Sequence, residues 1–285
     1  MEVIDARPTY LKSKRLPWEE LKLMPVGDLQ FGAPGCDVDR LKRHLDWGLR
    51  NDVMFIGMGD YHDFLSPSNR KYLMHAGLYD TAADLIEEWY MKHLEQLKEI
   101  LEPTRGRWIG LLEGHHYFEF SDGGTTDTEL ARYLDTVYLG DCAMVRLTFE
   151  KGRDRASCVL WAHHGQGGGG NANAGSILNK LESISSGFEA DIYLMGHASK
   201  VGASPIDRLE VTGKGEPLLR SRTKMLVATG AFMRSYQQGS KRMGRAQGSY
   251  PEQGMMKPVT LGGPVISITP RHGKRHYELD IKCSV

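Results

Sequence analysis

The sequence contains no apolar stretch of roughly 18 residues, the length that a membrane-spanning helix needs. Its first residues, MEVIDARPTYLKSKRLPWEE, also lack the apolar centre of a secretory signal. These absences argue against a membrane partner and against export. We therefore expect a cytoplasmic protein.

Cysteine is also scarce. The four cysteines, Cys36, Cys142, Cys158 and Cys283, lie far apart and show no paired spacing. A disulfide framework or a zinc knuckle would need such pairs. The pattern favours reduced thiols that are mostly buried.

Net charge is absent, because 36 Lys and Arg residues balance 36 Asp and Glu residues. No global field therefore indicates a polyanionic partner. Acidic residues are missing altogether between Pro217 and Pro251, a segment that we call the basic segment. Its charged side chains are Arg220, Arg222, Lys224, Arg234, Lys241, Arg242 and Arg245. The segment is either a solvated loop region or an anion-binding rim.

Apolar runs of strand length alternate with amphipathic helical patterns, which indicates an α/β protein. Strands are expected at 21–28, 53–60, 107–114 and 191–196, a hairpin at 144–165, and β-rich runs at 224–230, 262–270 and 275–283. Helices are expected at 37–51, 81–101 and 176–188. The apolar positions of the long helix, Leu85, Trp89, Leu94, Leu97 and Leu101, are expected to face a core. With no repeat and no clear linker, we expect one domain over residues 1–285, with its motifs in 23–200 and a β-rich part at 205–285.

Potential metal ligands and proton donors follow five of the expected strands. They are Asp28 and Gln30; Asp60, His62 and Asp63; His115 and His116; His163 and His164; and His197 and Ser199. Any one of them alone could be a helix cap or a hydrogen-bonded structural residue. Five groups in the same register, at the strand ends where open α/β sheets bind ligands, indicate a functional site.

The order of these strand ends resembles the calcineurin-like metallophosphoesterase family over roughly residues 23 to 200. Gly59 to Asp63 matches that family's Gly-Asp-x-x-Asp motif in full. At three other positions the sequence departs from the family's motifs. Gln30 and Ser199 replace histidines, and His115 replaces an asparagine. The glycine-rich run after His164 and the NKLE and LMGH stretches also resemble a phage and microbial branch. The resemblance implies a four-layer αββα sandwich with mixed sheets and a metal centre at the strand C-terminal ends.

The resemblance also implies two divalent metal ions. Asp60, His115, His197 and either His163 or His164 would form a nitrogen-rich site that suits zinc, manganese, iron or nickel. Spacing to Gly165 slightly favours His164, and the choice stays open. Asp28, the amide oxygen of Gln30 and the shared Asp60 would form a weaker site for manganese or magnesium, with Ser199 a weak ligand at best.

The implied activity is a metal-dependent phosphoesterase in which a metal-bound hydroxide attacks phosphorus in line. His116 would protonate the leaving oxygen, and Asp63 would orient the His116 ring. His62 would be a structural residue. A phosphodiesterase or nuclease acting on DNA or RNA ranks first, because the basic segment could track a nucleic-acid backbone. The alternatives are a phosphomonoesterase, a phosphoprotein phosphatase or a catalytically silent metal-binding relative. The glycine-rich run at 165–176 either cradles phosphate or forms a flexible lid, and nothing in the sequence names a protein partner.

Overall fold

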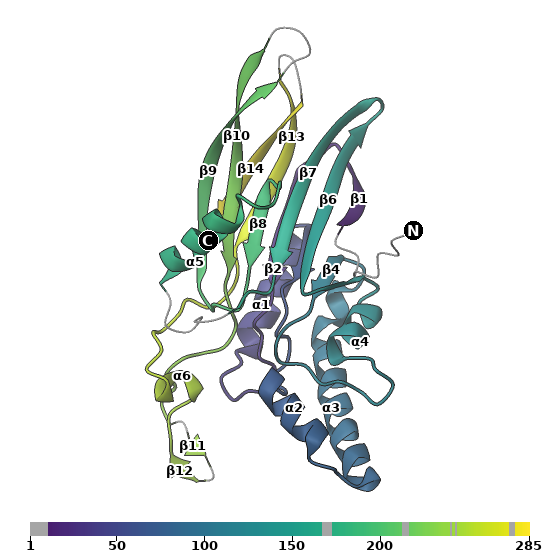
Figure 1. Cartoon of the computed structure of the whole chain (residues 1–285), viewed down its shortest axis with the longest axis vertical. Coiled ribbons are helices and arrows are strands. Elements are labelled where there is room, and N and C mark those ends of the chain that lie inside the picture. The colour runs from purple at the N-terminus through teal and green to yellow at the C-terminus, as the bar shows by residue number, and fades with distance from the viewer. Residues whose placement is uncertain (1–10, 167–172, 213–216, 240, 243, 274–276) are drawn as a thin grey trace, which may run out of the picture.

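The computed structural model describes residues 11–166, 173–212, 217–239, 241–242, 244–273 and 277–285. Two six-stranded sheets form the body of the molecule (Figure 1). The first has the order β14 (Tyr277–Ser284), β13 (Val265–His272), β2 (Leu21–Val26), β3 (Val53–Gly57), β4 (Trp108–Leu112) and β5 (Tyr138–Gly140). The second has the order β1 (Leu11–Pro17), β6 (Cys142–Lys151), β7 (Asp154–His163), β8 (Ile192–Met195), β10 (Leu218–Thr229) and β9 (Val201–Thr212).

Both sheets are mixed. Strands β2, β3, β4 and β5 run parallel, while β13 pairs antiparallel with β2. In the second sheet β7, β8 and β10 run parallel, and β6 forms the expected antiparallel hairpin with β7. Parallel neighbours end at the same edge, so the loops after them meet there.

The buried side chains form three cores, which define the layers. Leu23, Ile56, Val145 and Leu194 belong to a core shared by the two sheets. A second core joins the outer face of the first sheet to α1 (Val38–Arg50), α3 (Asp80–Leu101) and α4 (Thr126–Tyr133). A third joins the outer face of the second sheet to α5 (Ala174–Ile184). The expected four-layer αββα sandwich is therefore confirmed.

Three helices of the outer layers, α1, α3 and α5, form where the periodic patterns predict them. In α1 the apolar stripe buries Leu41 and Leu45 against the first sheet. Asp37 caps this helix, because its side chain accepts a hydrogen bond of 3.0 Å from the Arg40 backbone N–H. Helix α5 buries Ile177 and Leu181 in the third core.

Helix α3 departs from its predicted core face. Leu94, Leu97 and Leu101 are buried, but Leu85 is 67% exposed and Trp89 is 50% exposed. The expectation that these two face the core is wrong, because the 22-residue helix is about 33 Å long whereas the five-residue β4 spans about 17 Å. The first turns of α3 therefore extend past the sheet, beside α2 (Pro67–His75) (Figure 1).

Several short elements have no clear counterpart in the sequence pattern. These are β1, β5, α2, α4, the 3-10 turn Glu102–Thr104, the hairpin β11 (Lys241–Arg242) and β12 (Arg245–Ala246), and α6 (Tyr250–Gln253). In the described ranges, no helix combines the length and the apolar character that crossing a membrane requires. All four cysteines are free thiols, but the expectation that most of them are buried is wrong: Cys158 is buried, whereas Cys36, Cys142 and Cys283 are only partly buried.

Candidate metal centre

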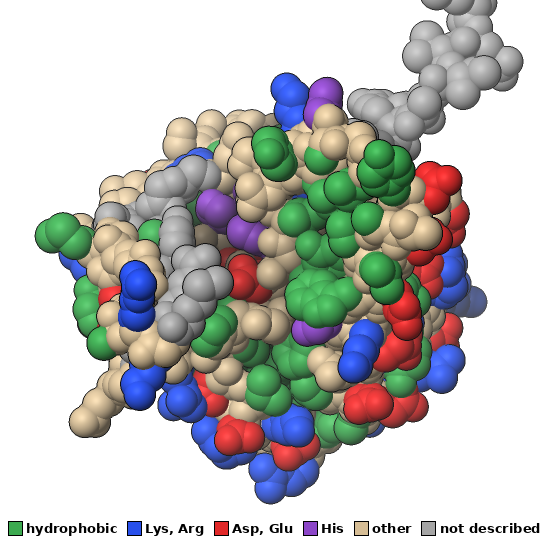
Figure 2. Space-filling view, turned by 90° about the horizontal axis from the view of Figure 1, so that it is seen from below, with side chains coloured by type: hydrophobic (Ala, Val, Ile, Leu, Met, Phe, Trp, Pro, Cys, Tyr) green, Lys and Arg blue, Asp and Glu red, His purple; other side chains and the backbone are tan. Residues whose placement is uncertain are grey.

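The predicted site residues of both sheets meet at one edge of the sandwich. Asp28, Asp60 and His115 follow the parallel strands β2, β3 and β4, and His164 and His197 follow β7 and β8. Viewed from this end, acidic and histidine side chains gather in a hollow with hydrophobic side chains on one flank (Figure 2). The topology thus places residues up to 169 positions apart in contact.

Two groups of ligand atoms form in this hollow, and His164 belongs to both. One group is His115, His164 and His197, and the other is Asp28, Asp60 and His164. Within each group the ligand atoms lie within 4.8 Å of one another. Among the described residues His163 is in neither group: its Nδ1 accepts the Gly165 N–H at 2.8 Å and its ring stacks on Trp161.

His164 is oriented by the backbone of β3's loop. Its Nδ1 lies 2.7 Å from the Met58 carbonyl oxygen, and its Nε2 lies 3.4 Å from Oδ2 of Asp60. A carbonyl can only accept, so Nδ1 carries the proton. The His164 side chain is 2% exposed and its Nε2 is buried without a hydrogen-bond partner. A buried ring nitrogen without a hydrogen-bond partner is suited to bind a metal ion.

The two carboxylates hold the loops of other strands in place. Asp60 Oδ1 accepts the backbone N–H groups of His115 and His116, the latter at 3.0 Å, and Asp28 Oδ2 accepts the His197 N–H at 2.9 Å. Asp28, Asp60 and His197 themselves have φ of 47°, 52° and 62°. Non-glycine residues adopt this left-handed region at a cost of order 1–3 kcal/mol, which is typical of functional sites.

Glycine allows the loops after β3 and β4 to approach each other closely. A Cβ on Gly114 would lie 2.0 Å from the Asp60 backbone nitrogen, and a Cβ on Gly59, whose φ is +87°, would lie 2.7 Å from Gly114 Cα. Any side chain at either position would push the loop after β4 away from Asp60. The hydrogen bonds from His115 and His116 to Asp60 would then break.

The ionisable groups of the hollow have pKa values shifted in different directions. Burial raises the pKa of Asp28 to about 7, an effect that the nearby His164 partly offsets. Burial also disfavours ionised Asp60, but the adjacent His164 holds the pKa of the Asp60 carboxyl well below its usual range. Burial opposes protonation of His164 too, yet the Asp60 carboxylate raises the pKa of His164 to about 9.

The other two imidazoles are held neutral. Burial, followed by the charge of His164, lowers the pKa of His197 to about 4 and also lowers the pKa of His115. The Nδ1 atoms of His115 and His197 lie 3.3 Å apart. Neutral imidazoles that converge in this way have lone pairs free to bind a metal. With two carboxylates added, the donor set fits a divalent ion such as zinc, manganese, iron, nickel or magnesium.

Gln30 and Ser199 lie at the margin of this set. The Nε2 of Gln30 donates to Asp60 Oδ2 at 2.9 Å, so an N–H group, and not the expected amide oxygen, faces the carboxylate. Ser199 is half-buried two residues after His197, and both Gln30 and Ser199 have φ near +50°. Neither residue adds a ligand atom to the second group, whose members are Asp28, Asp60 and His164.

The layer order and the position of this centre decide the fold. Helices cover both outer faces of two packed mixed sheets, and the Asp and His groups lie at the C-terminal ends of β2, β3, β4, β7 and β8. The chain has the calcineurin-like metallophosphoesterase fold.

No family model matches the sequence, and no curated protein matches it. Among solved structures, the chain is similar to GAP50 of Plasmodium at 10% identity and a TM-score of 0.42, with 92% of this chain and 84% of that chain covered. It is similar to Vps29 of Entamoeba histolytica complexed with zinc at 10% identity and a TM-score of 0.34, covering 92% and 99%. A predicted phosphoesterase of Streptococcus pneumoniae gives 10% identity and a TM-score of 0.31, covering 92% and 98%. All three scores lie below 0.5, so the chain's own layer order remains the basis for the fold.

The pair expected for proton transfer lies beside the two groups of ligand atoms. His116 Nδ1 and Asp63 Oδ1 are 3.9 Å apart, too far for a direct hydrogen bond. Burial raises the pKa of Asp63, and the nearby His116 acts in the opposite direction. His62 lies away from this pair, fully buried and stacked on Phe64 at 4.3 Å, and burial lowers its pKa to about 3.

Two residues that support the centre carry no sequence signal. Asp127 on α4 is buried and accepts the Gly114 N–H at 3.0 Å, and burial raises its pKa to about 7. Arg70 on α2 donates to backbone carbonyls in two of the loops. Both sit in helices that the sequence pattern missed, so only the packing reveals them.

The basic segment divides into two parts. Arg222 pairs with Asp191 at 2.5 Å, Lys224 with Glu189 at 2.9 Å, Arg220 with Glu210 at 3.7 Å, and Arg234 with Asp37 at 2.7 Å. Arg220, Arg222 and Lys224 lie in the N-terminal half of β10, whereas the C-terminal half of β10 pairs with β8.

The other part is the β11–β12 hairpin. Lys241 and Arg245 are exposed on it, at the same end of the molecule as α2 (Figure 1). The seven cations therefore do not form one continuous rim.

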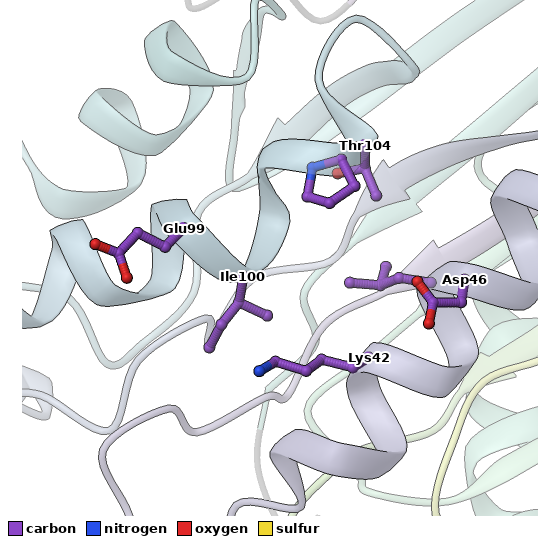
Figure 3. Close-up of a pocket in the computed structure, with 7 residues that line it drawn as sticks. Lys42, Asp46, Glu99, Ile100 and Thr104 are labelled. Carbon is purple, nitrogen blue, oxygen red and sulfur yellow. The ribbon is translucent and has the colours of Figure 1, made fainter.

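The expected phosphate cradle or lid lies largely outside the described residues, which omit 167–172. Two cavities lie elsewhere. One of about 380 Å³ lies between α1 and the end of α3 and is lined by Lys42, Leu45, Asp46, Glu99, Ile100, Pro103 and Thr104 (Figure 3). The other, of about 430 Å³, includes Arg155, Asp191, Arg222 and Tyr277. Neither includes a residue of the two ligand groups.

Proposed function

We propose that the protein is a metal-dependent phosphoesterase. The observation that carries this proposal is the convergence of three imidazoles and two carboxylates, from five strand ends, with ligand atoms within 4.8 Å in each group. His115, His164 and His197 would hold one ion, and Asp28 would hold a second, with Asp60 shared. Such ions supply Lewis-acid polarisation of a phosphoryl group.

The chain's own residues then divide the remaining work. Asp60 and Asp28 hold the backbone N–H groups of the loops that carry the histidines, so the ligand set is preorganised. His116 turns Nδ1 toward Asp63, which leaves Nε2 as the atom that would give its proton to the leaving oxygen. The Asp63 carboxylate, whose side chain is 42% exposed, lies 3.9 Å from Nδ1 and would orient the ring from that side.

For the substrate we propose a phosphodiester, with DNA or RNA first. The exposed Lys241 and Arg245, at the end of the molecule that carries α2, support this choice because they could contact a phosphate backbone. The four cations with carboxylate partners do not support it. Phosphomonoesters and phosphoproteins are therefore tested beside it.

The test begins with chelator-treated protein reloaded separately with manganese, zinc, magnesium, iron or nickel. Each form is assayed on bis(p-nitrophenyl) phosphate, p-nitrophenyl phosphate, a phosphoserine protein, single- and double-stranded DNA, RNA and cyclic nucleotides. Asp60→Asn should lose metal and turnover together, whereas Asp84→Asn, an exposed acid on α3, should keep both. Full metal content and rate in Asp60→Asn would overturn the proposal. The rival, a silent metal-binding relative, would hold at most one tight ion and turn over none of these substrates.

A further inference from the structure

Arg70 joins two loops of the centre through a single guanidinium nitrogen. Its Nη1 donates to the carbonyl oxygen of Leu65 at 2.6 Å, to that of His115 at 2.8 Å and to that of Tyr117 at 3.3 Å. The guanidinium also lies 3.6 Å from the centre of the Tyr117 ring. One side chain thus connects the loop after β3 with the loop after β4.

These two loops carry the residues proposed for proton transfer. Asp63 lies two residues before Leu65, and His116 lies between the two carbonyls of the second loop that Arg70 binds. His116 and Asp63 have no direct hydrogen bond, since their nearest atoms are 3.9 Å apart. Their separation is therefore set by how the backbones of the two loops are held.

The two loops are also joined at Asp60, three residues before Asp63, and the loop after β3 is anchored to the loop after β2. The Asp63 N–H donates to the Phe31 carbonyl at 2.9 Å, and the His116 N–H donates to Asp60 Oδ1 at 3.0 Å. Neither contact links the segment between Asp63 and Leu65 to the His115 and Tyr117 carbonyl groups of the loop after β4. Arg70 makes that link, because α2 begins directly after Asp63's loop, with Ser66 as its cap.

The contacts of Arg70 distinguish it from a substrate-binding residue. Its Nη1 is occupied by three protein carbonyls, and one face of the guanidinium is covered by Tyr117. The planar fork of arginine suits such a role, since a lysine ammonium could not stack in the same way. An arginine nitrogen bound to main-chain acceptors holds backbone and is not available to an anion at that atom.

We infer that Arg70 is a positioning residue that sets the distance between His116 and Asp63 for proton delivery to the leaving oxygen. This inference rests on the proposed function. Loss of Arg70 should act through His116, so it should matter for poor leaving groups, which need a proton, and little for good ones.

The experiment compares Arg70→Gln and Arg70→Lys with Lys71→Gln, an exposed neighbour on the same helix. With an alkyl phosphodiester, Arg70→Gln should lower kcat by about 10- to 100-fold, the range for losing a residue that orients an active-site group. With a nitrophenyl diester kcat should fall less than about threefold. KM and metal content should stay constant in Arg70→Gln. Arg70→Lys should retain only part of the rate of the wild type. A further variant, Arg70→Ala, should regain rate when guanidinium is added. Equal losses for both leaving groups would overturn the inference.

Hydrogen exchange separates this inference from the proposed function. Amide exchange in peptides covering 113–118 should rise in Arg70→Gln and stay unchanged in Lys71→Gln, whether or not the protein turns over a phosphoester. If the wild type hydrolyses nothing but exchange rises, the proposed function fails while the linkage of the loops is supported. If exchange does not rise, Arg70 does not hold this loop and the inference is wrong.

Discussion

The Nδ1 of His164 lies 2.7 Å from the carbonyl oxygen of Met58, and the opposite ring nitrogen, Nε2, lies 3.4 Å from Oδ2 of Asp60. The hydrogen bond to the carbonyl orients the ring, because only a protonated Nδ1 can make it. Metal-binding histidines in proteins are oriented by such a second hydrogen bond. His163, its neighbour, instead has its Nδ1 occupied by the Gly165 N–H.

Exchanging either histidine should therefore have unequal effects. His164→Ala should remove a ligand from both groups, and bound metal should fall by at least one ion per chain. His163→Ala should keep the metal content of the wild type, because its ring lies outside both groups. Metal content of dialysed protein, measured by inductively coupled plasma mass spectrometry, checks both. Loss of metal in His163→Ala but not in His164→Ala would reverse the assignment.

Gln30 provides a test of the second group of ligand atoms, which contains Asp28 and Asp60. Its Nε2 donates to Asp60 Oδ2, so the side chain contributes a proton where an imidazole would contribute a lone pair. Gln30→His should therefore tighten binding of the second ion by about tenfold or more, with Gln30→Leu as the control that removes the amide without adding a ligand. Calorimetric titration of chelator-treated protein measures the second binding step. Identical second constants in wild type and Gln30→His would contradict the prediction.

His116 should affect chemistry and not metal binding. His116→Ala should lower turnover of alkyl phosphodiesters by roughly 10²–10⁴, the usual effect of losing a general acid, while metal content stays the same. The loss should shrink for nitrophenyl esters, whose leaving groups need no proton. Parallel kcat measurements across a leaving-group series supply the check, and a constant loss along the series would exclude His116 as the acid.

The β11–β12 hairpin should set the salt dependence of nucleic-acid binding. Each phosphate contact with single-stranded nucleic acid contributes a log-log slope of about −0.7. The double variant Lys241→Gln, Arg245→Gln should weaken binding and flatten the slope by about 1.4. The control is Arg220→Gln on β10, whose side chain pairs with Glu210 and should leave the slope unchanged. Fluorescence anisotropy at several salt concentrations measures both, and an unaltered slope in the double variant would leave the hairpin without this role.

His44 on α1 should make stability depend on pH. Burial, with a contribution from Arg40, lowers the pKa of His44 to about 4, whereas an unfolded histidine titrates near 6.5. Between these values the unfolded state binds more protons, so stability falls as pH drops from about 6.5 to about 4 and is constant beyond either limit. The full effect is about 3 kcal/mol, since a pKa difference of one corresponds to about 1.4 kcal/mol.

His44→Gln isolates this contribution, because glutamine stays polar without titrating. Urea unfolding of both proteins at pH 7.5, 5.5 and 4.5 measures the difference. Relative to the variant, the wild type should lose stability steadily toward acid. A difference that stays constant across this range would show that His44 does not titrate with a lowered pKa.

Much of the fold and the site could be predicted from residue order alone. The continuous apolar run ending at Gly57 and the stripe of Leu41 and Leu45 have periods that only a buried strand and an amphipathic helix satisfy. Asp60 and His115 follow neighbouring parallel strands, and such strands bring their ends to one edge of a sheet. The sequence thereby determined the class of fold, the edge of the first sheet and the residue types of the candidate metal centre.

Only the tertiary structure decided the relationships that depend on distance. His163 and His164 are chemically identical and adjacent, and the Met58 carbonyl distinguishes them by binding one ring from another strand. The exposure of Trp89 follows from α3 being longer than β4. The apparent basic rim was divided because Asp191 and Glu189 reach Arg222 and Lys224 from about 30 residues away. Local patterns record periodicity and residue type, whereas these outcomes depend on contacts between segments that the chain brings together only when both sheets pack.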